Sequence, residues 1–217
     1  MAVLTKDYTV KDLLQDEAMV VKDDPFALVE GQFLTIKTKS GELVKFALNT
    51  IQKKILAKIK EFIAKGKPIR LWILKARQVG ISTLIEAIIY AFTSQREATN
   101  SLVIADDIDG SNYIFGMQKL FHEALDPHLK PQTRHSNEKK LEFDKTHSQI
   151  LIDTSDNLNA GRKYTFRYVH LSEVAYFRDL KILMLGLNKS VPNLTGTMII
   201  GETTANGIGN QFYDEWV

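Results

Sequence analysis

The segment that most constrains the fold of this 217-residue chain occupies positions 71–88 and reads LWILKARQVGISTLIEAI. A short apolar run comes first, a polar loop with Gly80 follows, and a helical pattern begins at Ser82. In this order the loop amides and the helix N-terminus converge on one point, where the helix dipole favours negative charge. Strand, loop and helix therefore follow one another as a phosphate-binding loop requires.

Buried strands and helices alternate through the rest of the chain. Apolar runs predict strands over 69–74, 101–105, 140–144, 148–154, 166–172 and 196–202, with 140–144 and 148–154 as an antiparallel pair. Helices are predicted from Ser82 to about Gln95 and from about Gly110 to Leu125. The alternation predicts an α/β fold with a mostly parallel central sheet that helices flank on both faces.

The pattern before residue 66 is different. Residues 33–48 alternate apolar and polar side chains around a break at Ser40-Gly41, which predicts a β-hairpin. A short helix is expected over 6–19, where the apolar residues at roughly helical spacing are Val10, Leu13, Leu14 and Met19.

A second helix is expected to follow the hairpin, with Asn49 as its cap and its end near Ala64. Its predicted apolar stripe consists of Ile51, Ile55, Ile59 and Phe62. We therefore expect a small N-terminal lid and hairpin region over 1–66 and the sheet core over 67–217.

The composition fits a soluble intracellular protein. The net charge is only +2, so the overall charge does not indicate nucleic-acid binding, although a local basic loop can still hold phosphates. The absence of cysteine excludes disulfide scaffolds, cysteine nucleophiles and thiolate zinc sites. No apolar stretch approaches the ~20 residues of a membrane span, and the N-terminus lacks the apolar region of a signal peptide.

The predicted loop departs from the standard phosphate-binding pattern, G-x-x-x-x-G-K-[ST]. Gly80 and Ser82 occupy the second glycine and the hydroxyl position. Ile81 stands where the lysine belongs, and Lys75 stands where the first glycine belongs. The cation that neutralises the γ-phosphate must therefore come from elsewhere in the loop.

Lys75 and Arg77, at the start of the loop, are alternatives for that cation, and either could reach over to the phosphates. Ser82 is the candidate ligand for Mg²⁺, or Thr83 if the register slips by one residue. In isolation, KARQ would be an ordinary solvated strand end. The nucleotide-binding residues predicted from this segment are Lys75, Arg77, Gln78, Val79, Gly80, Ile81, Ser82 and Thr83.

The second segment with chemistry is RYVHLSEVAYF, in which Glu173 follows the strand that ends at Ser172. In ATPases of the additional-strand class, a glutamate at this place polarises the attacking water, so Glu173 is the predicted general base. Ser172 stands where an aspartate is usual and would touch Mg²⁺ through its hydroxyl or a water. The predicted metal ligands are Ser82, Ser172 and Glu173; the alternative for Glu173 is a surface glutamate at a strand end.

The third segment is TTANG, which directly follows the predicted strand 196–202. Ligands of α/β folds bind at the carboxyl ends of the strands. Polar side chains at this place can sense a γ-phosphate, and Thr204 and Asn206 are the candidates. The alternative is a turn whose residues are chosen only for their backbone angles.

These three segments resemble motifs of phage large terminase subunits, the DNA-packaging motors. ARQVGIS is similar to their deviant Walker A loop, HLSEVAYF to the Walker B region of one branch, and TTANG to the coupling motif. The resemblance implies a P-loop NTPase of the additional-strand catalytic glutamate class. It also implies Mg²⁺-dependent hydrolysis of ATP that drives double-stranded DNA into a procapsid.

The same resemblance implies partners and a place of action. These are a homo-oligomeric ring on the portal protein, a small terminase subunit, and the host cytoplasm with the portal vertex of the procapsid. The C-terminal nuclease domain of the family is expected to be absent from this chain.

Two further segments gain an interpretation from the family. KFALNTIQKKIL resembles its adenine-recognition segment, which implies that Gln52 contacts the adenine edge and Phe46 packs on the ring. Arg162, in NAGRKYTFR, matches a short Gly-Arg segment and would stabilise transition-state charge in a neighbouring subunit. Lone surface glutamine and arginine residues are the alternatives.

Two other functions stay open at the level of sequence. A helicase or related translocase shares such an ATPase core, although helicases usually carry D-E-x-[DH] in place of the segment around Glu173. A non-hydrolysing nucleotide-binding or assembly module would explain the missing lysine at Ile81 and the missing aspartate at Ser172.

Overall fold

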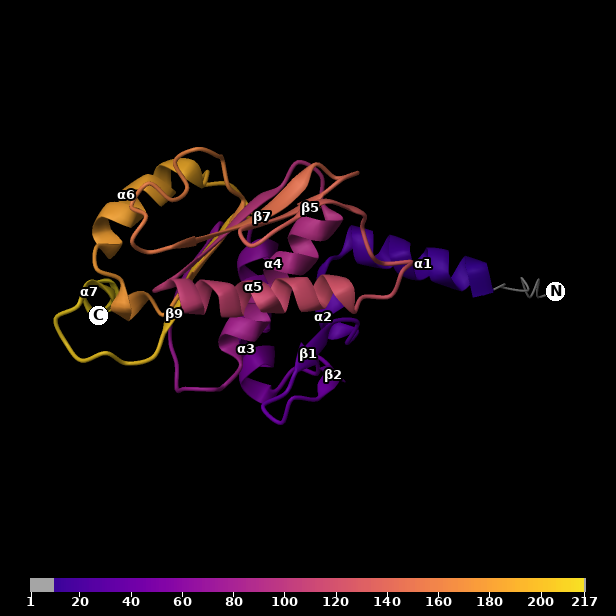
Figure 1. Cartoon of the computed structure of the whole chain (residues 1–217), viewed down its shortest axis with the longest axis horizontal. Coiled ribbons are helices and arrows are strands. Elements are labelled where there is room, and N and C mark those ends of the chain that lie inside the picture. The colour runs from indigo at the N-terminus through magenta and orange to yellow at the C-terminus, as the bar shows by residue number, and fades with distance from the viewer. Residues whose placement is uncertain (1–9, 217) are drawn as a thin grey trace.

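In the computed structural model, which describes residues 10–216, a seven-stranded sheet forms the middle layer (Figure 1). The strand order is β3-β9-β8-β4-β7-β6-β5. All pairs from β3 to β7 are parallel, and β6 and β5 add antiparallel at one edge. The strands are β3 (Ile69–Leu74), β4 (Asn100–Ala105), β5 (Thr133–Ser136), β6 (Lys140–Phe143), β7 (Ser148–Thr154), β8 (Tyr168–Ser172) and β9 (Met198–Thr203). The expected mostly parallel sheet and its antiparallel pair are confirmed.

Helices cover both faces of the sheet, as expected. On one face lie α4 (Ile81–Gln95) and α5 (Ile108–Glu123). On the other lie α6 (Leu180–Ser190), α7 (Gln211–Trp216) and the short 3₁₀ helix η1 (Val174–Tyr176). Successive strand side chains point to opposite faces, so Val103 of β4 joins the core beneath α4, while Leu102 and Ile104 join the core beneath α6.

The same alternation decides which polar side chains face α4. Tyr168 of β8 and Met198 of β9 belong to the core on the α4 side. Counting in steps of two along each strand brings His170, Ser172 and Glu202 to that face. All three are buried, with Ser172 5% exposed and the other two completely covered.

The N-terminal segments pack onto the α4 side of the sheet, α1 only through its C-terminal end. They are α1 (Val10–Asp23), α2 (Phe26–Glu30), the hairpin β1 (Thr35–Lys37) and β2 (Leu43–Lys45), and α3 (Thr50–Ala64). The predicted hairpin is confirmed, with β1 and β2 antiparallel across a turn in which Gly41 has φ of 89°. Leu28, Phe46 and Ile59 share one buried cluster with residues of α4 and β3. The boundary near residue 66 stays a prediction.

Helix α3 begins as predicted, because Asn49 and Gln52 form a reciprocal capping box. Its buried face, however, differs from the predicted stripe. Gln52, Leu56 and Ile59 are buried, whereas Ile51 is 46% exposed. The stripe was wrong at its first position because a polar residue, Gln52, occupies the inward-facing site in the first turn.

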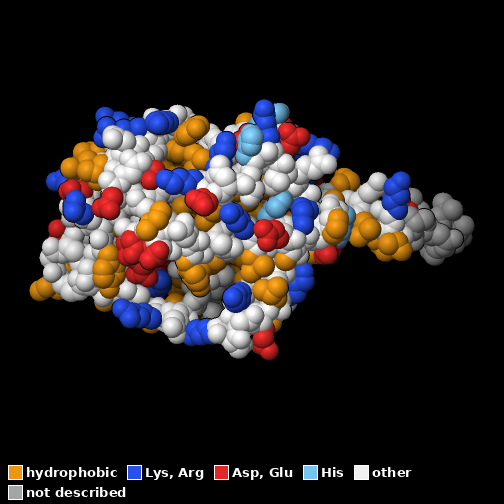
Figure 2. Space-filling model, in the orientation of Figure 1, with side chains coloured by type: hydrophobic (Ala, Val, Ile, Leu, Met, Phe, Trp, Pro, Cys, Tyr) orange, Lys and Arg blue, Asp and Glu red, His pale blue; other side chains and the backbone are white. Residues whose placement is uncertain are grey.

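Helix α1 projects away from the body of the molecule (Figure 1), and residues 6–9 of the predicted helix lie outside the described residues. The helix itself is confirmed from Val10 onward. Its apolar stripe does not reach the core: Val10, Leu13 and Met19 are exposed, and orange side chains line the projecting helix in Figure 2. No helix within residues 10–216, α1 included, has both the length and the apolar character to cross a membrane.

Candidate active site

The loop between β3 and α4 is fixed by its backbone and by three neighbouring side chains. Gly80 caps α4 in the left-handed region, at φ 75°. The Asn49 amide donates to the Val79 carbonyl at 3.2 Å, the Gln52 amide donates to the Gly80 carbonyl at 2.6 Å, and Lys39 of the hairpin turn binds Gln78. The first amides of α4 have no intrahelical partners, which is the arrangement that can bind an anion at a helix N-terminus.

The structure gives Gln52 and Phe46 positions that the adenine prediction did not anticipate. Both ends of the Gln52 side-chain amide are engaged, since Nε2 donates to the Gly80 carbonyl and Oε1 accepts from the backbone N–H of Asn49 at 2.9 Å. Phe46 is 2% exposed and packs in the core. Their direct contact with a base stays an untested prediction, whereas the contact of Gln52 with the loop is present.

Gly80→Ala is expected to destabilise this loop by about 1–2 kcal/mol, the cost of the left-handed region for a residue with a Cβ. The new Cβ would also lie 2.7 Å from Gln52 Nε2, so the bond that anchors the loop must shift. Urea unfolding should show the loss. Gly116→Ala in α5 is the control: nothing lies within 4 Å of its Cβ position, so it should be neutral or stabilising. Equal stability of the two variants would contradict the strain at Gly80.

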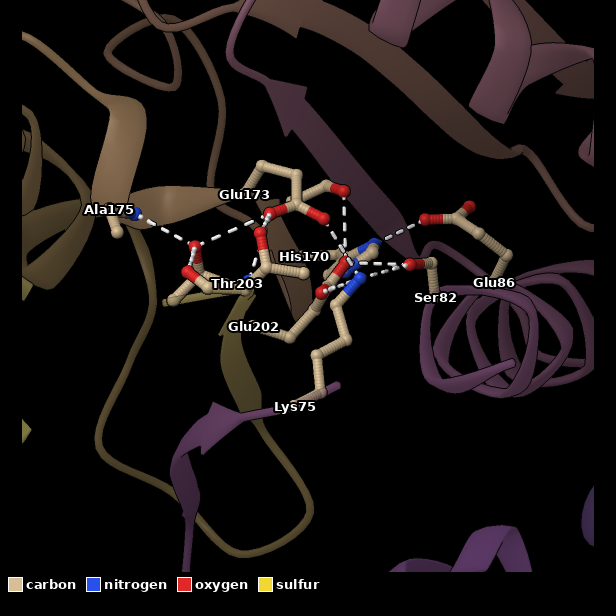
Figure 3. A network of polar contacts seen from close by, with 10 residues as sticks. Lys75, Ser82, Glu86, His170, Glu173, Ala175, Glu202 and Thr203 are labelled. Atoms are coloured by element: carbon tan, nitrogen blue, oxygen red, sulfur yellow. Dashed lines mark hydrogen bonds and ion pairs between the residues drawn. The ribbon is translucent and has the colours of Figure 1, made fainter. Parts of the chain in front are cut away.

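Lys75 lies at the centre of a polar network that joins β3, α4, β8 and β9 (Figure 3). Its ammonium is 2.9 Å from Glu173 Oε1 and 2.8 Å from Glu202 Oε2, and it lies 3.4 Å from Ser82 Oγ. The side chain is only 8% exposed. Burial alone would lower the pKa of Lys75, but Glu202 and Glu173 outweigh it and raise the pKa, so the amine stays charged.

Glu202 is the acid that links the serines of this network. Its Oε1 accepts hydrogen bonds from Ser82 Oγ at 2.8 Å and from Ser172 Oγ at 2.9 Å. His170 Nε2 lies 3.4 Å from the same oxygen, and Nδ1 of His170 contacts Glu86 of α4. Burial would raise the pKa of Glu202, but His170 and Lys75 lower it to about 2, so the carboxylate is ionised.

Glu173 lies directly beyond β8 with a left-handed backbone, at φ 59° and ψ 46°. A glutamate there costs of order 1–3 kcal/mol and persists only where its surroundings impose it. The surroundings here include Thr204, whose amide and hydroxyl donate to Glu173 Oε2 at 2.9 and 3.1 Å, and the Thr203 hydroxyl at 3.3 Å. The base and sensor predicted separately from sequence are therefore in direct contact.

Other predicted residues lie around or away from this network. Asn206 binds the Ala175 carbonyl at 3.0 Å, which ties the TTANG segment to η1. Arg77 is exposed on the loop. Arg162 is also exposed, and it lies beside Gly186 of α6.

Four residues of this region were not singled out from the sequence: Glu86, Asp106, His170 and Glu202. Asp106 follows β4, and burial, Asp107 and to a lesser degree Glu173 raise its pKa. The sequence did contain a signal for two of them. Glu202 interrupts the apolar run MIIGET, and Glu86 lies in the apolar face of α4. A buried acid in an apolar run needs a partner, and that requirement could have marked both positions.

A pocket of about 530 Å³ adjoins the first turn of α4. It lies between the hairpin and α5, and its lining includes Lys37, Lys39, Thr83, Tyr113 and Met117. This volume is within the range of small-molecule sites.

The fold matches solved structures of phage large terminases. The large terminase of bacteriophage HK97 has a TM-score of 0.71 and 15% identity, over 90% of this chain and 40% of that protein. The large terminase ATPase domain of Thermus phage P74-26 gives 0.57 and 17%, over 78% and 69% of the two chains. The large terminase of a thermophilic bacteriophage in complex with ADP gives 0.51 and 9%, over 72% and 39%.

No protein-family model matches the sequence, and no curated protein matches it. The structural likeness, at identities below 20%, concerns the arrangement of the backbone. This chain spans 40% of the length of the HK97 protein. The chain therefore has the fold of the phage large terminase ATPase domains.

Proposed function

We propose that this chain is the Mg²⁺-dependent ATPase part of a viral DNA-packaging motor. The observation that carries the proposal is the meeting of Lys75, Ser82 and Glu173 at the carboxyl ends of the parallel strands, beside the free amides of α4. A charged amine, a hydroxyl and a carboxylate at this place are the groups that phosphoryl transfer to water uses.

The groups of the site have distinct roles in the proposed reaction, and Glu173 has two, as base and as metal ligand. The amides at the start of α4 bind the β- and γ-phosphates. Lys75 compensates the charge that develops on the transferred phosphoryl group, and Arg77, free on the loop, gives a second cation. Glu173 accepts a proton from the attacking water and orients it in line with the bond that breaks.

The oxygen atoms of this site suit a magnesium ion, which prefers carboxylate, hydroxyl, water and phosphate oxygen. Ser82, Ser172 and Glu173 are the proposed ligands, directly or through water. Within residues 10–216, no three His, Cys, Asp or Glu side chains gather as a metal site, so phosphate oxygens would complete the coordination. The bound ion would neutralise phosphate charge.

The pocket between the hairpin and α5 is the proposed place of the nucleoside. Its lining includes Thr83, the residue after the proposed metal ligand Ser82, and the exposed aromatic ring of Tyr113. Gln52 then acts on the nucleotide through the loop that it holds.

Hydrolysis would be coupled to movement of the chain through Thr204. Loss of the γ-phosphate would free Glu173 to change its hydrogen bonds with the TTANG segment. The proposed partners follow from the terminase fold and the resembling motifs: double-stranded DNA, the portal protein, a small terminase subunit and a ring of identical subunits. The proposed place of action is the host cytoplasm, at the portal vertex of the procapsid.

Mg²⁺-dependent hydrolysis of ATP by the purified chain is the first test, measured across protein concentrations. If Arg162 acts on a neighbour's nucleotide, the rate per subunit should rise with concentration, and Arg162→Ala should lower the assembled rate by about 10³–10⁵-fold. Nucleotide binding should not change in this variant, because Arg162 lies beside α6, on the face of the sheet opposite α4.

Arg134→Ala is the matched control, since Arg134 is an exposed arginine on β5 whose nearest acid, Glu142, is 3.9 Å away. Unchanged hydrolysis in Arg162→Ala would remove the trans-arginine role and leave the ATPase proposal intact. A chain that binds no nucleotide at all would refute the proposed function.

A further inference from the structure

Three side-chain oxygen atoms from different segments lie around the Lys75 ammonium, and oxygen atoms of these kinds also bind metal ions. They are Ser82 Oγ from α4, Glu173 Oε1 from beyond β8, and Glu202 Oε2 from β9. Two of these residues, Ser82 and Glu173, belong to the proposed Mg²⁺ site. The amine therefore lies where hard oxygen donors from three segments converge, which is the donor set that Mg²⁺ and Mn²⁺ select.

Glu202 supplies what β8 lacks. Strand β8 ends in Ser172, where a metal-binding aspartate is usual, and Ser172 pairs in register with Glu202 of β9. The Glu202 carboxylate accepts hydrogen bonds from both Ser172 and Ser82. An acid on the neighbouring strand thus reaches the place of the missing aspartate, with Ser172 leaving room for it.

We propose that Glu202 is the carboxylate that holds the divalent cation, and that the Lys75 ammonium occupies the cation's place until nucleotide binds. This inference rests on the proposed function, since it assigns the metal site of that ATPase. It differs from the sequence-based ligand set by adding Glu202. It also implies that the Lys75 side chain moves from the cation site to the phosphates when nucleotide binds.

Charge explains why the exchange needs nucleotide. Glu173 and Glu202 together carry two negative charges beside Lys75, and the buried pair of His170 and Glu86 next to Glu202 adds no net charge, so Lys75 balances one of the two. A divalent cation that entered alone would displace the buried amine and leave it unpaired, which is strongly unfavourable. Nucleotide phosphates give the displaced amine a new partner, so metal and nucleotide should bind together.

Binding of Mn²⁺, followed by electron paramagnetic resonance as the loss of the free-ion signal, tests this directly. The wild type should bind Mn²⁺ at this site only with ADP or ATP. Lys75→Met vacates the cation position without adding charge, and it should bind Mn²⁺ without nucleotide at least about tenfold more tightly than the wild type does. Adding Glu202→Gln to Lys75→Met should abolish that gain.

Controls and a second variant keep the result interpretable. Lys65→Met removes an exposed lysine that pairs with Glu61, and it should gain no Mn²⁺ site. Ser82→Ala in the Lys75→Met background replaces a partly exposed ligand and should weaken Mn²⁺ binding even if the Glu202 variant misfolds. Circular dichroism checks each fold.

The outcomes separate this inference from the proposed function. A folded Lys75→Met chain without the Mn²⁺ gain would overturn the exchange, and a gain that survives Glu202→Gln would overturn the assignment of Glu202. Either could occur in a wild type that binds and hydrolyses MgATP. Failure of the proposed function would appear instead as no nucleotide binding by the wild type.

Discussion

Glu173→Gln is expected to lower the rate of ATP hydrolysis by about 10²–10⁴-fold, the contribution of a positioned general base. The amide keeps the size of the carboxylate and can still accept from the Thr204 amide, but it cannot take a proton from water. The loop, Ser82 and the α4 amides are untouched and the glutamine keeps an oxygen toward the proposed metal site, so nucleotide binding should persist. Single-turnover hydrolysis and fluorescent-nucleotide binding measure the two effects separately.

Glu138→Gln, an exposed glutamate before β6, is the matched control and should hydrolyse at the wild-type rate. Retention of full activity in Glu173→Gln would show that another carboxylate is the base. Asp106 would then be the next residue to replace, because it directly follows β4 and its pKa is raised by burial, by Asp107 and, to a lesser degree, by Glu173.

Glu86→Ala is expected to have the largest effect on stability. Glu86 is completely buried on α4 and contacts both His170 and Gln118. Removing one partner of a buried ion pair costs about 3–5 kcal/mol, because the other charge stays buried without compensation. For a chain of this size the midpoint of thermal unfolding should fall by roughly 10 °C. Glu97→Ala, at an exposed position beyond the same helix, should change stability by less than ~0.5 kcal/mol.

The pH dependence gives a second readout of this pair. Burial would lower the pKa of His170, but Glu202 and Glu86 raise it from 6.5 to about 9. The folded state therefore binds this proton more tightly than the unfolded state, so the stabilisation is complete below pH 6.5 and is lost as pH rises through 9. Glu86→Ala should flatten this decline. A wild type whose stability does not fall between pH 7 and 9.5 would contradict a charged His170.

Much of the fold could be predicted because its signals are local. The loop of 75–80 lies between an apolar strand and a helix that are neighbours in sequence, and Asn49 caps its helix with Gln52 three residues away. Helix α6 was not predicted, although its buried Leu180, Leu183 and Leu187 have helical spacing. Ile51 was wrongly given to a buried stripe because hydrophobicity alone sets no rotation for a helix whose first turn buries a glutamine.

The candidate site could be predicted only in part. Lys75, Ser82, Glu173 and Thr204 came from three motifs, and the structure brings these four residues into one network. The predictions for Arg162, Phe46 and Gln52 stay open as functional roles. Their positions are now known: Arg162 lies beside α6, Phe46 is in the core, and Gln52 is bound to the loop.

The sequence by itself determined the strand-loop-helix unit and the alternation that forms a parallel sheet, and it marked Glu173 and Ser82 as the predicted base and the predicted hydroxyl ligand. These features depend on residues close together in the chain, whose spacing encodes them. Only the tertiary structure decided that Glu202 stands beside Ser172, with Lys75 held between two acids. That arrangement depends on the pairing of β9 with β8 and on which face each side chain takes, and a shift of one residue in register would have turned Glu202 to the opposite face.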